Sequence, residues 1–162
     1  MKKHLISLFL LFALLPLSAR AAGDPVTRGG FAVLLWESQG GVPFDKTAHP
    51  FADLPDDGQA QAVAWAYCEG LVQGVGGGLF APDRPLTREE CAVLLRRLDA
   101  SLGRDVLFPG GGALCNDYQD ISPWADDSLY WACVTGRMAW QENRLAPQGL
   151  VSAEEAETLL HF

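Results

Sequence analysis

The chain has 162 residues, of which 12 are basic and 20 are acidic, so its formal net charge at neutral pH is −8. A surface this acidic repels nucleic acid and anionic lipid at long range, which excludes nucleic-acid binding as a function. Any anionic ligand must therefore be held by a few locally placed basic side chains.

The N-terminal residues have the three parts of a secretory signal peptide. Lys2 and Lys3 are basic, residues 5–17 are almost entirely apolar, and Ala19 and Ala21 have the spacing that signal peptidase recognises. The apolar run is shorter than the roughly 20 residues that span a bilayer. We therefore predict that residues 1–21 are removed and that the mature protein is secreted, with no membrane association. An uncleaved membrane anchor is the alternative.

From Val26 onward the predicted elements are helices. The first begins after Thr27, a residue suited to cap a helix. The next covers about residues 59–69 and ends at Gly70, where a left-handed cap fits. A third begins at Thr87, because Thr87 and Glu90 have the spacing of a capping box.

The same two-helix pattern recurs further along the chain, at an offset of 65 to 67 residues. Its helices are predicted over about residues 125–135, ended by Gly136, and from Ser152 onward. We assign residues 22–45 to a half repeat, 46–104 to a full repeat and 105–162 to a full but degenerate repeat. Helical hairpins this small cannot bury their apolar faces alone, so the repeats must pack into one all-α unit.

The mature region contains four cysteines, which allow three disulfide pairings. The pairs closest in sequence, Cys68–Cys91 and Cys115–Cys133, would each join a helix to a nearby segment. Small buried thiols are the alternative, and the sequence does not choose between them. Because there is no Cys-x-x-Cys motif or Cys/His cluster, we predict no metal site and no cofactor.

The order of motifs in these repeats resembles the S-layer homology (SLH) repeat. The matching segments are Phe51-x-Asp53, Gly70-Leu71-Val72-Gln73-Gly74, Phe80-Ala81-Pro82-Asp83 and Thr87-Arg88-Glu89-Glu90. The resemblance covers essentially all of the mature chain and implies a pseudo-threefold bundle of helical hairpins. It also implies noncovalent binding to secondary cell-wall polysaccharides, commonly ones that carry ketal-linked pyruvate, and hence a cell-surface location.

In the family, an Arg of the Thr-Arg motif, the Asp of Phe-x-Asp and a nearby Trp line grooves between adjacent repeats. Carried over by this resemblance, the expected ligand-binding residues are Arg28 with Asp53 in one groove, and Arg88 with Asp120 and Trp124 in a second. The residue chemistry agrees, since a guanidinium at the start of a capped helix can hold a carboxylate through two hydrogen bonds. An indole can stack on the apolar face of a sugar.

The last repeat departs from the family pattern, because Ala153 replaces the motif Arg and Gln148 replaces the Asp after Pro147. In the full repeat, the position that corresponds to Trp124 is Gly58. We therefore expect one complete groove at Arg88, one weakened groove at Arg28 and one that has lost its function.

Two alternatives stay open. Each Arg can instead pair with Asp53 or Asp120 and simply lock neighbouring repeats together. The bundle can also be an extracellular protein-interaction module that has lost glycan binding, with a homo-oligomer or an envelope protein as its partner. An enzyme is not predicted, because His49 and His161 have no Ser or Cys partner in a recognisable catalytic motif.

Overall fold

The computed structural model describes residues 23–107 and 115–161; the predicted signal peptide lies outside them. The helices in these ranges are α1 (Arg28–Ser38), α2 (Gly58–Cys68), α3 (Arg88–Ser101), η1 (Tyr118–Asp120), η2 (Pro123–Ala125), α4 (Ser128–Val134) and α5 (Ala153–Leu160), where η denotes a 3-10 helix. The same ranges contain isolated β-bridges and no strand, so the all-α prediction is confirmed. None of the described helices is long and apolar enough to cross a membrane.

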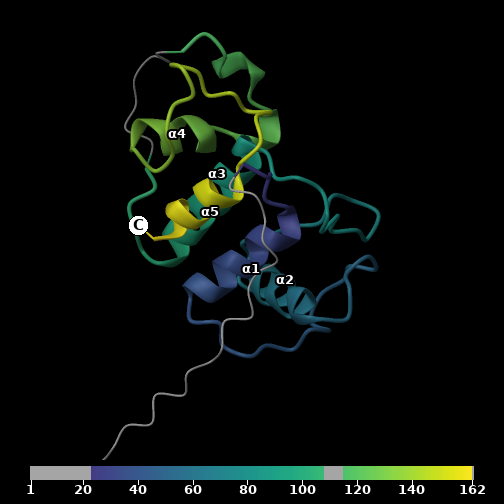
Figure 1. Ribbon diagram of the computed structural model, residues 1–162. Coiled ribbons are helices and arrows are strands. Elements are labelled where there is room, and N and C mark those ends of the chain that lie inside the picture. The colour runs from purple at the N-terminus through teal and green to yellow at the C-terminus, as the bar shows by residue number, and fades with distance from the viewer. Residues whose placement is uncertain (1–22, 108–114, 162) are drawn as a thin grey trace, which may run out of the picture.

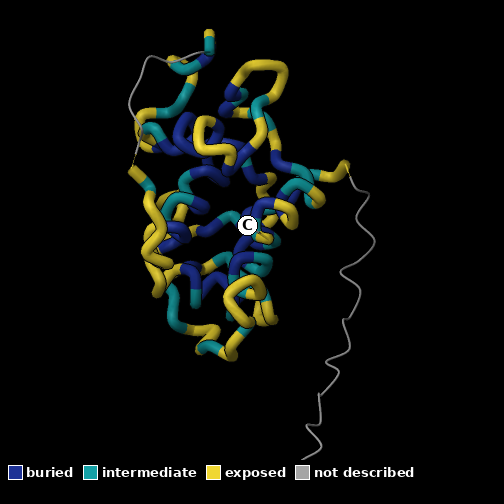
Figure 2. The backbone as a smooth tube through the Cα atoms, turned by 90° about the vertical axis from the view of Figure 1, so that its left-hand side faces the viewer, coloured by how far each residue is buried: buried dark blue, intermediate teal, exposed yellow. Residues whose placement is uncertain are grey.

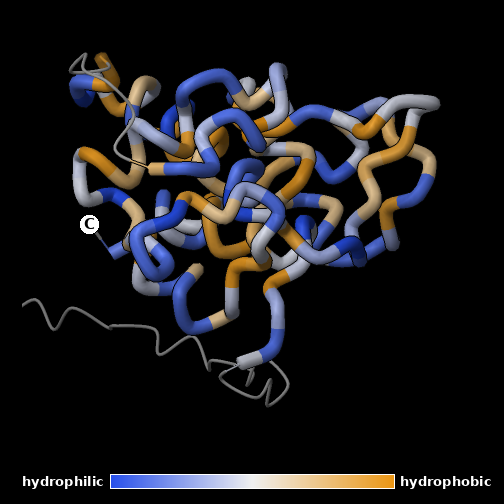
Figure 3. Tube along the Cα trace, turned by 90° about the horizontal axis from the view of Figure 1, so that it is seen from above, coloured by the Kyte–Doolittle hydropathy of each residue, from blue (hydrophilic) through white to orange (hydrophobic). Residues whose placement is uncertain are grey.

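The helices pack in pairs that join one repeat to the next. Helix α1 packs on α2 and α3 packs on α4, while α5 packs on α1 and brings the end of the described chain back to its beginning (Figure 1). The buried residues form a band through the middle of the molecule, and the loops at both ends are exposed (Figure 2). Seen from above, apolar segments gather inside and hydrophilic ones dominate the outer turns (Figure 3).

Three short segments before α1, α3 and α5 form a closed ring of hydrogen bonds. Val26 donates its N–H to the carbonyl of Val151 at 2.8 Å, Val151 donates to Leu86 at 3.1 Å, and Leu86 donates to Val26 at 2.9 Å. All three side chains are buried. Because each segment plays the same part in the ring, the predicted pseudo-threefold arrangement is confirmed, and it closes within one chain.

The helix starts follow the predicted capping chemistry. The hydroxyls of Thr27, Thr87 and Ser152 each accept a hydrogen bond from a backbone N–H three residues further on. The capping box is complete at Thr87, where Glu90 bonds back to the cap residue. The equivalent Glu155 bonds instead to an arginine of the preceding repeat.

The helix ends also agree with the sequence, with one difference. Gly70 and Gly136 both have positive φ, +72° and +76°, as a left-handed cap requires. Helix α4 is shorter than the predicted span of residues 125–135. Its first turn separates as η2, because Asp126 takes a positive φ of 49° and interrupts the helix. The interruption leaves Trp124 on a short turn of its own.

The four cysteines all lie in the described part of the chain, and each is a free thiol. Cys91 and Cys133 are buried in the apolar core, whereas Cys68 is exposed. Neither of the two disulfides considered from the sequence, Cys68–Cys91 and Cys115–Cys133, is therefore formed. Desolvation raises the pKa of Cys133 to about 11.

Candidate functional site

The guanidinium of Arg28 connects α1 to the following repeat through three hydrogen bonds. It donates from Nε to the carbonyl of Phe80, from Nη1 to Glu90 and from Nη2 to the carbonyl of Gln73, each at 3.0 Å. It also lies 4.8 Å from the centre of the Phe80 ring. Desolvation lowers the pKa of Arg28 and the charge of Glu90 acts in the opposite direction, but a guanidinium remains charged.

Arg88 repeats this arrangement one repeat later. It donates from Nε to the carbonyl of Leu145 at 2.9 Å, from Nη1 to Glu155 at 3.0 Å and from Nη2 to the carbonyl of Ala139 at 2.7 Å. Both arginines thus lock neighbouring repeats, although their acidic partners are Glu90 and Glu155 and not the aspartates expected from the sequence. Arg28 is 9% exposed and Arg88 is 0% exposed, so Arg88 offers no surface to a ligand in this structure.

Two aspartates bind the loops whose Phe80 and Leu145 carbonyls accept hydrogen bonds from the two arginines. Asp53 accepts hydrogen bonds from the N–H groups of Phe80 and Ala81 at 2.8 and 2.7 Å. In the last repeat, Asp117 accepts from the N–H groups of Leu145 and Ala146 at 3.1 and 2.8 Å. The residue that matches Asp53 in the structure is therefore Asp117.

The sequence motifs assigned Asp120 to the position equivalent to Asp53, but Asp120 is exposed at the end of η1. Its side chain has no partner among the described residues. Asp53 and Arg28 influence each other electrostatically without forming a direct ion pair, because both bind the Phe80 loop. Desolvation acts to raise the pKa of Asp53, but the backbone hydrogen bonds outweigh it and hold that pKa below its ordinary value.

Glu89 of the Thr-Arg-Glu-Glu motif positions the turn that carries Trp124. Its carboxylate is 2% exposed and accepts hydrogen bonds from the N–H and the hydroxyl of Ser122, both at 2.9 Å. Gln148 donates to the same carboxylate at 2.8 Å. With Ser122 held in this way, η2 places the Trp124 indole on the surface, where it is 58% exposed.

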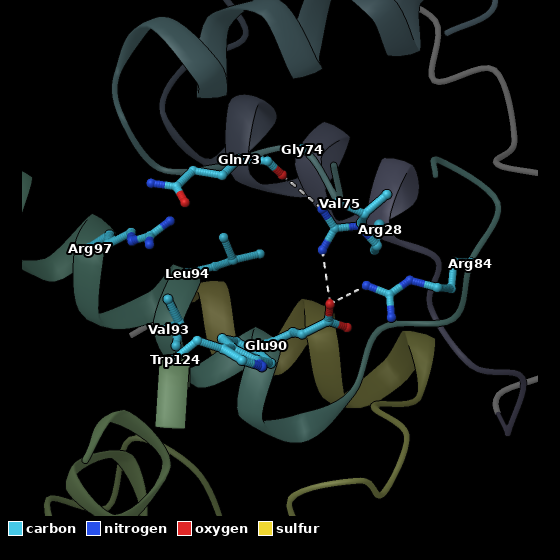
Figure 4. Close-up of a pocket in the computed structure, with 10 residues that line it drawn as sticks. All are labelled: Arg28, Gln73, Gly74, Val75, Arg84, Glu90, Val93, Leu94, Arg97 and Trp124. Carbon is cyan, nitrogen blue, oxygen red and sulfur yellow. Dashed lines mark hydrogen bonds and ion pairs between the residues drawn. The ribbon is translucent and has the colours of Figure 1, made fainter. Parts of the chain in front are cut away.

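Trp124 borders a cavity of about 410 Å³ beside Arg28. Figure 4 shows that Arg28 and Arg84 both reach the carboxylate of Glu90 on one side of this cavity, which we call the Arg28 pocket. Arg97 lies on the opposite side, near Gln73. The other lining residues are Gly74, Val75, Val93 and Leu94.

The charges around the Arg28 pocket do not cancel. Three guanidiniums line it, with Glu90 as the one carboxylate among the lining residues. Glu90 already pairs with both Arg28 and Arg84. Arg97 donates from Nη1 to the carbonyl of Leu71 at 2.9 Å and pairs with no acidic side chain in the described part of the chain. The pocket is thus a locally positive site on an acidic protein.

The structure therefore brings together a different set of site residues from the groove of Arg88, Asp120 and Trp124 that the sequence predicted. Trp124 lies in the pocket of Arg28, whereas the contacts of Arg88 involve neither Trp124 nor Asp120. Sequence reasoning did not identify Arg84 or Arg97 as site residues. A signal for Arg97 was present, because it follows Glu90 by seven positions and thus lies on the same face of α3.

The next groove around the pseudo-threefold axis has about the same volume and different chemistry. This cavity of about 410 Å³ lies beside α5, where Glu155 and Ala139 take the places of Glu90 and Gln73. Glu154 also lines it, and no aromatic side chain does. Its one basic lining residue, Arg137, is buried and paired with Asp99. This groove lacks the positive surface and the exposed indole of the Arg28 pocket.

Residues 50–92 match the family model of the S-layer homology domain. An endoglucanase from Bacillus sp. (strain KSM-635) is 33% identical to this chain over 111 residues. The aligned region covers 68% of this chain and 12% of the endoglucanase, so the chain spans only a small part of that relative.

Proposed function

Because the chain belongs to the S-layer homology domain family, whose members are non-catalytic modules that associate with the cell surface, we propose that it binds an acidic cell-wall polysaccharide through the Arg28 pocket. The observation that carries the proposal is the pairing of an excess of guanidinium groups with an exposed indole at one cavity. Binding is noncovalent and needs no cofactor.

The charge of the pocket favours an anionic ligand. The protein as a whole carries a formal charge of −8, so long-range attraction does not bring an acidic polymer to its surface. Selectivity must come from close contact, and guanidinium groups bind carboxylates through paired, charge-assisted hydrogen bonds. Arg97 retains donors for this purpose, since its only hydrogen bond within the described residues uses Nη1.

The position of Trp124 favours a sugar. An exposed indole can stack on the apolar face of a pyranose ring, and Glu89 holds the turn of Trp124 through Ser122, so the ring is presented without further rearrangement. A sugar that carries ketal-linked pyruvate combines such a face with a carboxylate. We therefore take a pyruvylated secondary polysaccharide of the cell wall as the ligand.

The proposal moves the functional groove from Arg88 to Arg28. Arg88 is fully buried, and the groove beside its partner Glu155 lacks both an exposed cation and an aromatic ring. We still propose one complete groove, now at Arg28. Its ligand-binding residues are Arg28, Arg84, Arg97 and Trp124, and Asp53 holds the Phe80 loop beside it.

Co-sedimentation with purified cell-wall sacculi tests the proposal. Trp124→Ala and Arg84→Gln should each weaken binding about tenfold or more, equal to ~1.4 kcal/mol. Matched controls are Tyr67→Ala, which removes an exposed aromatic ring outside the pocket, and Lys46→Gln, which removes the same charge elsewhere. Mild acid treatment of the walls, which removes ketal-linked pyruvate, should reproduce the effect of the pocket variants.

The rival function, an extracellular protein-interaction module, predicts the opposite pattern. Binding would then survive in walls stripped of polysaccharide and would be lost after protease treatment of the walls. Unchanged binding by both pocket variants, with the controls behaving alike, would contradict the polysaccharide proposal.

A further inference from the structure

The buried carboxylate of Glu89 has hydrogen-bond donors on both of its oxygens, and one of them comes from Gln148. Oε2 accepts from the N–H of Ser122 at 2.9 Å, and Oε1 accepts from the Ser122 hydroxyl at 2.9 Å and from the side-chain amide of Gln148 at 2.8 Å. Because a buried charge is costly unless it is hydrogen-bonded, the amide of Gln148 stabilises the carboxylate that holds Ser122.

The equivalent contact one repeat earlier shows which residues correspond. Gly29 donates its N–H to the carbonyl of Pro82 at 2.9 Å, and Glu89 donates its N–H to the carbonyl of Pro147 at 3.1 Å. Gly29 on α1 and Glu89 on α3 therefore occupy the same place, and each lies beside the residue that follows the proline.

The residues that follow these prolines are Asp83 and Gln148. Asp83 is exposed, and its side chain has no hydrogen bond or ion pair in the described part of the chain. Its neighbour Gly29 has no side chain, and an added Cβ there would lie 2.5 Å from the side-chain carbon of Gln59. An acid is thus tolerated at position 83, whereas an acid at position 148 would lie beside the carboxylate of Glu89.

We propose that Gln148 is a positioning residue for Trp124, which it holds in place through Glu89 and Ser122 without touching the ligand. Gln148 is not among the residues that line the Arg28 pocket. The replacement of the family's Asp by Gln148, which the sequence motifs indicated to be a loss, then serves the neighbouring groove by supplying a donor. This inference rests on the proposed function, in which Trp124 contacts the sugar.

Exchanging the amide and the carboxylate between the two residues tests this role without changing the shape of either side chain. Gln148→Glu alone places two carboxylates together, so Glu89 loses a donor and the turn at Ser122 loosens. Glu89→Gln alone introduces an NH2 group that must face either the N–H of Ser122 or the amide of Gln148, so one donor meets another.

The double variant Glu89→Gln/Gln148→Glu restores all three hydrogen bonds. The introduced amide donates from the Oε1 position to the introduced carboxylate and to the Ser122 hydroxyl, while its oxygen still accepts from the Ser122 N–H. Losses in the single variants that disappear in the double variant are the signature of a direct interaction between the two side chains.

The first measurement is the heteronuclear NOE of the Trp124 indole N–H in the free protein, which reports the order of the ring. The NOE should fall in each single variant and return to the wild-type value in the double variant. Gln141→Glu is the matched control, because it makes the same chemical change at an exposed amide whose side chain has no hydrogen bond among the described residues. It should leave the Trp124 signal unchanged.

The second measurement is co-sedimentation of the same variants with cell-wall sacculi. Each single variant should bind about threefold more weakly than the wild type, and the double variant should recover wild-type binding. If both single variants keep the wild-type NOE, or if the double variant recovers neither order nor binding, the positioning role of Gln148 is refuted and the proposed function stands. If the NOE follows the expected pattern while wall binding is the same in every variant, Trp124 is not a ligand contact, and the proposed function fails although Gln148 still positions the indole.

Discussion

Replacing Arg88 by alanine should destabilise the fold rather than remove a ligand contact. The side chain is completely buried, and its loss leaves the carbonyls of Leu145 and Ala139 without their donor. The Leu145 carbonyl is a buried acceptor, and leaving it unpaired costs about 1–3 kcal/mol. The Ala139 carbonyl costs less, because Ala139 is exposed and its carbonyl keeps a weak contact with the Cys133 thiol. Glu155 also loses its ion-pair partner, although its side chain is 27% exposed and water can replace part of that interaction.

Breaking a buried ion pair typically costs about 3–5 kcal/mol, and the exposure of Glu155 places Arg88→Ala near the lower end, at about 3 kcal/mol. This is a large fraction of the ~5–15 kcal/mol that stabilises an ordinary domain. Arg28→Ala should cost less, because Glu90 keeps Arg84 as a partner. Arg144→Ala is the control. Arg144 pairs with Asp117 at 3.5 Å, but its side chain is 63% exposed, and ion pairs of exposed side chains contribute about 0–1 kcal/mol.

Urea denaturation followed by circular dichroism measures these differences, provided that the dependence on urea stays the same in each variant. A double-mutant cycle with Glu155→Gln isolates the ion pair from the carbonyl contacts. An Arg88→Ala protein that is as stable as the wild type but no longer binds cell walls would refute the reasoning. It would show that Arg88 contacts the ligand, as the sequence alone suggested.

The remaining predictions concern acid stability, thiol reactivity and the surface of the pocket. Desolvation acts to raise the pKa of Asp117, but hydrogen bonds from the backbone N–H groups of Ala146 and Leu145 hold it below its ordinary value. A carboxylate whose pKa is lowered in the folded state stabilises the protein above its ordinary pKa, so the free energy of unfolding should fall as the pH drops below about 4. Asp117→Asn should make that fall less steep and should cost about 1 kcal/mol at neutral pH. An equally steep acid transition in the variant would contradict this prediction. At pH 8 a maleimide should label exposed Cys68 well before buried Cys133, whose pKa is raised to about 11, and mass spectrometry of the labelled peptides distinguishes the two; equal rates would contradict the burial. Trp124→Ala should leave the urea midpoint within the error of the wild type, because the indole is 58% exposed, and a large loss of stability would assign Trp124 to the core.

The local features of the fold could be predicted from the sequence because they depend on neighbouring residues. Thr87 and Glu90 form the predicted capping box, and Gly70 takes the left-handed conformation expected at a helix end. The repeated motifs also indicated that the copies pack on one another, which the ring through Val26 confirms.

The register of the last repeat was harder to predict, because two aspartates compete for one place. Asp117 and Asp120 are three residues apart. Tyr118 precedes Asp120 by two positions, which is the spacing of the aromatic residue and the aspartate in the Phe-x-Asp motif. The choice is made by tertiary structure. Only Asp117 reaches the N–H groups of the Leu145 loop, where it is 3% exposed.

The composition of the pocket depends on contacts that no single repeat contains. Arg28 comes from the segment predicted as a half repeat, Arg97 from the predicted full repeat and Trp124 from the predicted degenerate one. A comparison of repeats assigns Trp124 to Arg88, the arginine of the preceding Thr-Arg motif. The structure instead directs Trp124 across α3 to the Arg28 pocket, because Glu89 fixes the Ser122 turn on that side.

The most direct test of the pocket is the indole N–H signal of Trp124 in a ¹H–¹⁵N NMR spectrum during titration with purified acidic cell-wall polysaccharide. Of the five tryptophans, Trp124 is the one that lines the Arg28 pocket, so its signal should shift while those of Trp36, Trp65, Trp131 and Trp140 stay nearly constant. Trp124→Ala identifies the signal. Saturable binding of the polysaccharide with the Trp124 signal unmoved would place the ligand elsewhere and contradict the account.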